Sequence, residues 1–592
     1  MARTPIRDFL DGYENTSHDG SSSVLGRRFF CRSLSGTVTP AMIGATKRGI
    51  LRLLTVLNKK IQYASAKSYG AMSLAFGLVT IILSFLADYG SATGQAATVS
   101  FIIGVCFALL SIPLLLVDGP VALIFQNSRF LDKILFEFLC INRVQRNEAV
   151  KPMPIAVNAI FGALLGFIGY FIPAWWVIVG YFALLFIYLS MGSPEFALFT
   201  MIFALPYASV DPRALTALSA VSVLAIISFL RKVLSGKRVF SFEQYDLLVL
   251  LTVLSILISG VFVKGVDVFL ASGVSCVLTL VYFLSSNLIT NRRLADCMLF
   301  STVLSVLPAT VHAYVIAVSA AVADGPVAIL RGGVGSVFGR SDTFAAFLLI
   351  AIVLDIALIK QTHGIARAAM VTLAVLYLGA LVITGEYAAV LALVLGIVVY
   401  LALQLRNIWS CVVTVAAFLL PYIAVAALYF IIPTNTSLMP DGKSAAELVS
   451  GVANAAREIM AHPVLGEGAQ SVTTGSLNIF IDIAAGTGIP TLLFFALMLG
   501  VRQRHRTLYH FYIKNSEISI LSPAVAAAAL GFLCFASVSA IWNSPAAYCI
   551  FWAIFGLGSA TLRVAKKEHD DRVLYFEDAI DSESSVVDVN IV

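Results

Sequence analysis

Apolar stretches of about twenty residues, separated by short polar segments, recur along most of the chain. A helix of about 20 residues crosses the roughly 30 Å hydrocarbon core of a bilayer, so each stretch predicts a transmembrane helix. The stretch at 194–210 is short and is also compatible with a re-entrant segment. The pattern predicts an all-α polytopic membrane protein with about 14 to 16 transmembrane helices, near 70–87, 97–117, 155–172, 174–190, 194–210, 214–230, 246–263, 268–289, 295–318, 343–359, 368–384, 387–404, 408–432, 486–501, 519–541 and 544–562.

Composition agrees with this interpretation and removes other classes of protein. Hydrophobic residues make up 59% of the 592 positions and charged residues only 12%, about half the share in a typical soluble chain. A secreted enzyme, a nucleic-acid-binding protein and a disulfide scaffold are thereby excluded. The eight cysteines are scattered, with no C-x-x-C motif and no histidine at ligand spacing. We therefore expect no disulfide, no metal site and no cofactor.

Four regions are predicted along the chain. Residues 1–69 form a basic cytoplasmic segment in which "KRGILRLLTVLNKK" is an interfacial helix. Residues 70–150 hold two transmembrane helices and a cytoplasmic amphipathic segment at 118–150. Residues 151–562 form the main polytopic domain. The tail 563–592 is polar and ends acidic, so it is predicted to be a disordered cytoplasmic segment.

The side of each loop follows from the distribution of Lys and Arg, which are enriched in cytoplasmic loops. With the N-terminus inside, only six of the 39 Lys and Arg residues lie outside. Both termini are therefore predicted to be cytoplasmic, and the longest extracytoplasmic loop is 433–484, followed by 319–342. The outside cations are Arg213, Lys264, Arg331, Arg340, Lys443 and Arg457.

The two outer loops carry most of the candidate chemistry. In the glycine-rich loop 319–342, Arg331 and Arg340 offer guanidinium groups suited to phosphate oxygens, or else anchor helix ends at the headgroups. In the loop 433–484, residues 444–461 have the spacing of an amphipathic helix, which is also typical of a helix lying on the bilayer surface. His462 and Pro463 end that helix, and Asn478 opens the approach to the next span.

Two further ionisable residues lie near the outer ends of spans. Placing the charged side chain of Glu386, in "VITGEYAAV", at membrane depth costs free energy. Glu386 therefore either pairs with Arg331 or Arg340 or acts as a general base. His312 in "PATVHAYVIA" is either a hydrogen-bonded structural residue or a residue with a direct functional role, and the structural role is favoured.

Three blocks of this sequence resemble the O-antigen ligase and O-antigen polymerase superfamily of bacterial polysaccharide assembly. They are "RGGVGSVFGRSDTFAAFLLIAIVL", "VITGEYAAVLALVLGIVVYLAL", and "MAHPVLGEGAQ" followed by "LNIFIDIAAGTGIPTLLFF". The blocks occur in the family's order and span roughly residues 331–501, and the third contains the pattern H-P-x-x-G-x-G. Three positions depart from the family pattern: Glu386 replaces an arginine, Leu477 replaces a histidine, and Gly486 replaces an acidic residue.

The resemblance implies a membrane glycosyltransferase that works on the outer face of the bacterial cytoplasmic membrane. It implies metal-independent, inverting transfer of glycan from an undecaprenyl-diphosphate-linked donor to an acceptor glycan or glycolipid. On this interpretation Arg331, Arg340, Arg457 and Asn478 bind substrate, whereas Glu386 and His462 are the catalytic candidates. Membrane lipids are the other expected partners, and no nucleic acid is expected.

Two alternatives remain open at this point. One is a transporter or flippase of lipid-linked glycan, which would place ionisable groups near the bilayer midplane, often in repeated halves. The other is a catalytically silent relative that binds lipid-linked glycan, since positions used by the family for binding and catalysis are replaced.

Overall fold

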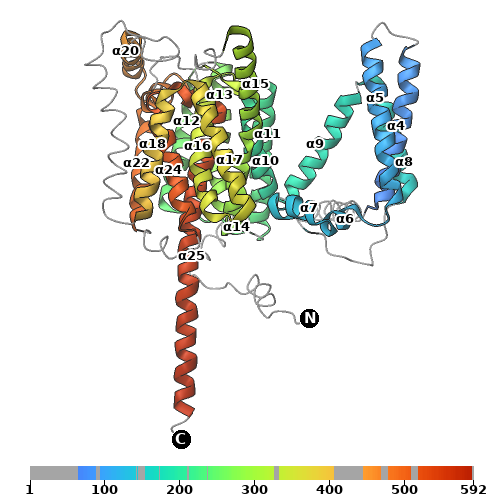
Figure 1. Ribbon diagram of the computed structural model, residues 1–592. Coiled ribbons are helices and arrows are strands. Elements are labelled where there is room, and N and C mark those ends of the chain that lie inside the picture. The colour runs from blue at the N-terminus through green and yellow to red at the C-terminus, as the bar shows by residue number, and fades with distance from the viewer. Residues whose placement is uncertain are drawn as a thin grey trace, which may run out of the picture. The chain divides into compact units, whose positions relative to one another are not determined.

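The computed structural model describes residues 64–88, 94–141, 143, 154–172, 174–209, 212–236, 238–263, 265–325, 333–405, 445–468, 478–508, 516 and 518–589 (Figure 1). The regular structure in these ranges is helical, without strands. Eleven helices there are long and apolar enough to cross a membrane, and three shorter apolar helices accompany them. An all-α polytopic membrane protein is therefore confirmed. The number of crossings stays a prediction, because the apolar run 408–432 lies outside the described residues.

The chain divides into two compact units. Unit 1 comprises residues 1–127 and 144–178, and unit 2 comprises residues 128–143 and 179–592. The described helices of unit 1 are α4 (Ala66–Asp88), α5 (Gly94–Leu116), α6 (Val121–Asn127) and α8 (Ile155–Phe171). Helix α9 (Ala174–Gly192) starts in unit 1 and continues in unit 2.

Glycine lets the helices of unit 1 approach closely. A Cβ atom on Gly77 of α4 would lie 2.7 Å from the carbonyl oxygen of Gly104 on α5, and one on Gly162 of α8 would lie 2.1 Å from that of Met72. Lipid supplies no hydrophobic force between helices, so association depends on such small residues and on interhelical hydrogen bonds. Ser73 adds one such bond, from its hydroxyl to the carbonyl of Phe107 at 2.8 Å.

Unit 2 contains the remaining elements. The short ones are α7 (Arg129–Leu131), the π-helix η1 (Asp132–Phe138), η2 (Leu205–Ser209), η4 (Ser336–Phe338) and η5 (Ala540–Asn543). The longer ones are α10 (Pro194–Ala204), α11 (Pro212–Leu234), α12 (Gln244–Phe262), α13 (Val266–Leu288), α14 (Arg292–Ser305), α15 (Leu307–Asp324), α16 (Ser341–Gln361), α17 (Gly364–Thr384), α18 (Tyr387–Leu405), α20 (Ala445–Ala461), α21 (Ile479–Thr487), α22 (Ile489–Leu508), α24 (Leu521–Ala536) and α25 (Pro545–Val589).

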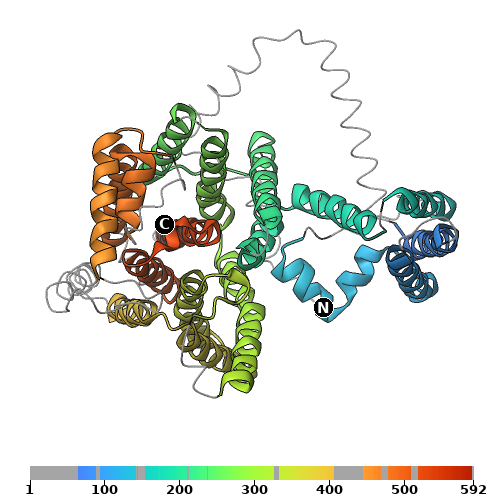
Figure 2. The same cartoon turned by 90° about the horizontal axis from the view of Figure 1, so that it is seen from above.

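Helices α16 and α25 form the centre of unit 2. The most apolar part of α16 is 83% buried and that of α25 is 94% buried, well above the values of the other spans. Seen from above, α25 lies among the other helices of the unit (Figure 2). Both helices are apolar on all sides within the bundle, which is the pattern of a helix surrounded by other helices.

Side-chain contacts define two ends of unit 2. We call the first the Asn478 end. Four helices begin there, α16, α18, α21 and α25, and α17 ends there. The backbone N–H of Gly333 donates a 2.8 Å hydrogen bond to the carbonyl of Thr384 at this end. At the second, the Arg563 end, the guanidinium of Arg563 on α25 lies 3.5 Å from Glu243 and donates to Asn287 at 3.4 Å. Arg563 thereby ties α25 to the start of α12 and the finish of α13.

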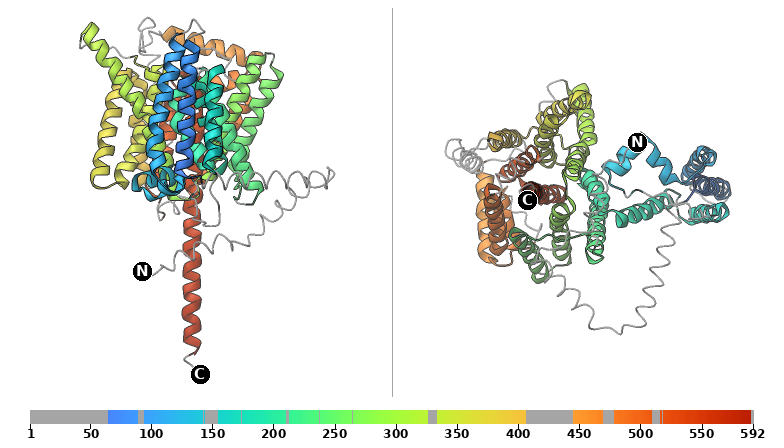
Figure 3. Two further views of the ribbon diagram at one scale, coloured as in Figure 1. Left: turned by 90° about the vertical axis from the view of Figure 1, so that its right-hand side faces the viewer. Right: turned by 90° about the horizontal axis from the view of Figure 1, so that it is seen from below.

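The structure differs from the expected elements in three places. The expected span 295–318 is two helices, α14 and α15, which meet at Val306 because Pro308 cannot continue the hydrogen-bond ladder. The expected span 486–501 begins at Ile489, because Gly488 has a φ of +90° and ends α21. Helix α25 continues through 563–589, where we expected a disordered tail (Figure 3). Its sequence after Gly558 contains no further glycine and no proline.

Candidate functional site

Asn478 joins two elements at the Asn478 end. Its side-chain oxygen accepts hydrogen bonds from the backbone N–H groups of Phe480 at 2.9 Å and Ile481 at 3.4 Å, so it caps α21. Its amide nitrogen donates to the carbonyl of Ser537 at 3.1 Å, at the finish of α24. Asn478 therefore fixes α21 against the connection between α24 and α25.

Arg340 reaches the same connection from α16. Its guanidinium forms a two-point ion pair with Asp342, with Nε 3.1 Å from Oδ1, and Nη2 also donates to the carbonyl of Ala540 at 3.4 Å. The side chain of Arg340 remains 49% exposed, whereas that of Asp342 is 15% exposed. The exposed part of this side chain can meet an anion, in competition with the carboxylate of Asp342.

Glu386 lies next to the start of α16. The hydroxyl of Ser341 donates a hydrogen bond of 2.7 Å to Oε1 of Glu386. Glu386 is half-buried, and it stands between α17 and α18 directly after Gly385, whose φ of +72° requires glycine or a strained residue. Glu386 is thus bonded to the residue that follows Arg340 in the chain.

His462 and Arg457 belong to a different part of the same region. Both are exposed, Arg457 on α20 and His462 just beyond it. The turn after His462 is bound to the finish of α21, with Ile489 donating to the carbonyl of Pro463 at 2.9 Å and Gly468 donating to that of Gly486 at 2.7 Å. Asn478 caps the opposite end of α21, a helix of about 13 Å at 1.5 Å per residue. His462 is thus separated from Asn478 by the length of α21.

Two carboxyl groups that the sequence reasoning missed accompany His462. Burial and the negative charge of Glu467 raise the pKa of the carboxyl of Glu458. A carboxylate whose pKa is raised is a stronger proton acceptor than an ordinary one. Glu458 precedes His462 by one helical turn, and its carbonyl accepts the backbone N–H of His462 at 3.0 Å. The spacing of four residues between Glu458 and His462 was the sequence signal that could have identified Glu458.

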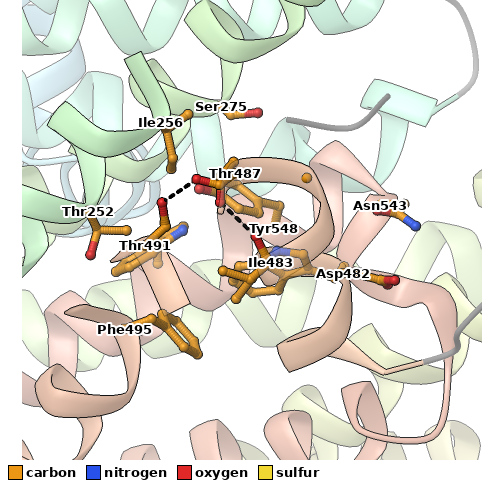
Figure 4. A pocket seen from close by; sticks show the side chains of 13 residues that line it. Thr252, Ile256, Ser275, Asp482, Ile483, Thr487, Thr491, Phe495, Asn543 and Tyr548 are labelled. Atoms are coloured by element: carbon orange, nitrogen blue, oxygen red, sulfur yellow. Dashed lines mark hydrogen bonds between the residues drawn. The ribbon is translucent and has the colours of Figure 1, made fainter. Parts of the chain in front are cut away.

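A small cavity of about 40 Å³ lies between α21 and the centre of unit 2 (Figure 4). It has room for two or three water molecules, at about 15 Å³ each, and is too small for a sugar ring. Polar and aromatic side chains mix on its wall, which is lined by Thr252, Ile256, Ser275, Asp482, Ile483, Gly486, Thr487, Thr491, Phe495, Trp542, Asn543, Tyr548 and Trp552.

Asp482 is the charged residue of this wall and was also missed. It is 8% exposed and lies four residues after Asn478, so both residues share one face of the chain as α21 begins. The signal was an aspartate inside the apolar run "IFIDIAAG".

The remaining sequence candidates fall elsewhere. Arg331 and Leu477 lie outside the described residues. The ring nitrogen Nδ1 of His312 lies 3.2 Å from the hydroxyl of Ser336, so His312 connects α15 to η4. Within the described ranges, no group of three or more His, Cys, Asp and Glu residues is arranged to hold a metal ion.

Neither a protein-family model nor a curated protein sequence matches the chain. The fold and the site by themselves define a polytopic helical membrane protein with a polar, partly charged region at the Asn478 end.

Proposed function

We propose that this protein is a membrane glycosyltransferase of the O-antigen ligase or polymerase type. The observation that carries the proposal is that Arg340, Glu386 and Asn478, from three separate sequence blocks, lie in one hydrogen-bonded region. In this proposal, glycan is transferred with inversion from an undecaprenyl-diphosphate-linked donor to an acceptor glycan or glycolipid, without a metal ion. The reaction contributes to assembly of a surface polysaccharide.

The roles of the residues follow from charge and position. Departure of a lipid diphosphate leaves negative charge that a fixed guanidinium stabilises, and Arg340 supplies one, with Arg331 and Arg457 as further donors. The acceptor hydroxyl loses a proton, and the carboxylate of Glu386 is the first base, oriented by its bond from Ser341. His462, beside Glu458, is the second candidate base. Asn478 positions α21 through its bonds to Phe480 and Ser537.

The same proposal assigns the sides of the membrane. The Asn478 end faces the extracytoplasmic side of a bacterial cytoplasmic membrane, with the loop 433–484 above it and both termini in the cytoplasm. Helix α20 lies there at the interface as an amphipathic element. Support comes from the Lys and Arg distribution and from α20, where Gly451 and Ala455 are buried while Val452, Asn454 and Arg457 are exposed.

Transfer by the purified protein tests this proposal. Supplied with lipid-linked oligosaccharide in nanodiscs, the wild-type protein is expected to lengthen the glycan, and Arg340→Ala is expected to slow the reaction by about 100-fold or more. Arg213→Ala removes another cation predicted to be outside and is expected to keep the wild-type rate. Donor binding without extension for every acceptor tried would instead identify a silent glycan-lipid-binding relative.

One observation favours a transporter of lipid-linked glycan as the second candidate. Asp355 lies within α16, its exposed fraction is 0%, and neither carboxyl oxygen has a hydrogen-bond partner within the described part of the chain. Ionisable residues inside transmembrane helices commonly mark transport or proton pathways. Transport predicts protein-dependent movement of intact lipid-linked glycan across sealed vesicles, lost in Asp355→Asn. Glycosyl transfer predicts an Asp355→Asn variant that still extends glycan.

A further inference from the structure

Two cysteines that are far apart in the sequence come together in unit 2. Cys140 follows the π-helix η1, and Cys297 lies in the second turn of α14. Both thiols point at one acceptor: the carbonyl oxygen of Glu137 lies 3.7 Å from Sγ of Cys140 and 3.6 Å from Sγ of Cys297. The Cys297 side chain is also the largest influence on the pKa of the Cys140 thiol. Scattered cysteines in the sequence gave no indication of this pair.

The backbone holds Cys140 firmly in this position. Its φ of +53° lies in the left-handed region, which a non-glycine residue adopts only when its surroundings fix it. The hydroxyl of Ser193 donates to the carbonyl of Cys140 at 2.6 Å. The N–H of Leu139 donates to the carbonyl of Ile134 at 2.9 Å. These bonds keep the thiol turned toward α14.

The two thiols differ in access and in acidity. Cys297 is 7% exposed, whereas Cys140 is half-buried. The hydrogen bond from the Cys297 thiol lowers the pKa of the Cys140 thiol, and Arg293 and Arg238 act in the same direction against burial and Glu195. The thiolate is the nucleophilic form of cysteine, so Cys140 is the more reactive partner.

We propose that Cys140 and Cys297 form a redox-responsive dithiol site, which closes to a disulfide when a small-molecule disulfide oxidant is present. The thiolate of Cys140 attacks one sulfur of the oxidant and expels its other sulfur as a thiolate. Cys297 then loses its proton and attacks Sγ of Cys140, which forms the Cys140–Cys297 bond and releases the second oxidant thiolate. The oxidant gains two electrons, and the two cysteines lose two electrons and two protons.

A disulfide between Cys140 and Cys297 would act on the segment 128–143, which contains Cys140. Residues 128–143 belong to unit 2, although residues on both sides of them, up to 127 and from 144, belong to unit 1. A Cys140–Cys297 disulfide fastens this passage of the chain covalently to α14. In a reducing compartment such bonds are transient and serve sensing or catalysis, so a reversible bond is expected. This inference is independent of the proposed glycosyl transfer.

Peptide mapping of the full-length protein tests the site. The protein in nanodiscs is incubated with oxidised glutathione, its remaining thiols are blocked with N-ethylmaleimide, and it is digested without reduction. We expect an intramolecular cross-link between the peptides that contain Cys140 and Cys297, absent after treatment with dithiothreitol. Cys297→Ser should replace it by a stable glutathione adduct on Cys140, and Cys106→Ser should leave the cross-link intact.

Three outcomes would overturn the proposal. In the first, the wild-type protein carries glutathione on Cys140 while Cys297 is recovered with N-ethylmaleimide. In the second, cross-links form only among other cysteines. In the third, Cys140 and Cys297 are joined only between two chains, which migrate as a dimer without reductant. The wild-type digest decides among these outcomes even if a serine variant fails to fold.

Discussion

The hydroxyl of Ser341 donates a 2.7 Å hydrogen bond to the carboxylate of Glu386, and this bond joins the first residue of α16 to the start of α18. Helix α16 is at the centre of unit 2, so the carboxylate is attached to one of the two most buried helices of the bundle. A general base needs such fixed orientation, because a small misplacement lowers the rate of proton transfer.

Removing this bond should lower activity without removing the base. We expect Ser341→Ala to slow glycan extension by about tenfold, and Glu386→Gln to slow it by about 100-fold or more. The initial rate of extension at saturating donor measures both. Ser319→Ala is the matched control, since among the residues that the structure describes the Ser319 hydroxyl bonds to its own helix, at the carbonyl of Ile316. Equal rates for Ser341→Ala and Ser319→Ala would remove the orienting role.

Asn478 offers a test that separates stability from activity. Asn478→Ala removes the cap of α21 and should lower the free energy of unfolding by about 1 kcal/mol. Asn291 caps α14 at the Arg563 end by accepting from Leu294 at 2.9 Å, so Asn291→Ala should cost a similar amount. Thermal unfolding in detergent measures both losses. Only Asn478→Ala should also reduce glycan extension, and an equal reduction in Asn291→Ala would indicate a purely structural effect.

Close helix packing in unit 1 predicts an intolerant glycine. Alanine at Gly162 would place a Cβ 2.1 Å from the carbonyl oxygen of Met72, so α8 must move away from α4. The expected cost is about 1–3 kcal/mol, visible as a lower unfolding temperature. Beyond its chain neighbours and its own helix backbone, no atom of the described residues lies within 4 Å of a Cβ built on Gly180, so Gly180→Ala should be neutral. A neutral Gly162→Ala would contradict the close approach of α4 and α8.

The acidity of Cys140 can be measured directly. Because its pKa is lowered by the Cys297 thiol, Cys140 should become a thiolate at lower pH than an ordinary thiol. Its rate of alkylation by iodoacetamide should therefore reach half of its maximum at lower pH in the wild-type protein than in Cys297→Ser. Mass spectrometry of the Cys140 peptide gives this profile. Coincident profiles would show that Cys297 does not stabilise the thiolate.

The carboxyl group of Asp355 should be protonated and therefore neutral. An ionised carboxylate without a partner in a buried transmembrane helix costs several kcal/mol, so the protonated form is favoured. Difference infrared spectroscopy at neutral pH should show a carboxylic acid C=O band that is absent from Asp355→Asn. Finding only carboxylate bands for this residue would require a cation or a hydrogen-bond donor beside Asp355.

Periodic hydrophobicity was sufficient to predict the helical membrane fold, because each span must satisfy its backbone hydrogen bonds internally. It could not locate the breaks at Val306 and Gly488, where apolar residues continue on both sides of the interruption. It also could not rank the spans by burial, since lipid-facing and protein-facing positions are equally apolar. The central place of α16 became evident only from packing.

The candidate site was predictable in part. The glycine-rich outer loop indicated Arg340, a carboxylate at a span end indicated Glu386, and the long outer loop indicated Asn478. The structure places these residues at one end of unit 2. Asp342 lies only two residues after its partner Arg340 and was overlooked. Asp482 was missed because the other walls of its cavity come from distant segments. The pair of Cys140 and Cys297 was missed for the same reason, since a shared acceptor at Glu137 has no signature in sequence spacing.

The central claim is glycosyl transfer at the Asn478 end, and the most direct measurement is the yield of free undecaprenyl diphosphate from wild-type and Glu386→Gln protein in sealed proteoliposomes. The proposal predicts that the wild-type protein releases one undecaprenyl diphosphate for each glycan transferred, and that Glu386→Gln releases almost none while still binding donor. Movement of the intact lipid-linked glycan across the bilayer, without release of undecaprenyl diphosphate, would contradict the claim.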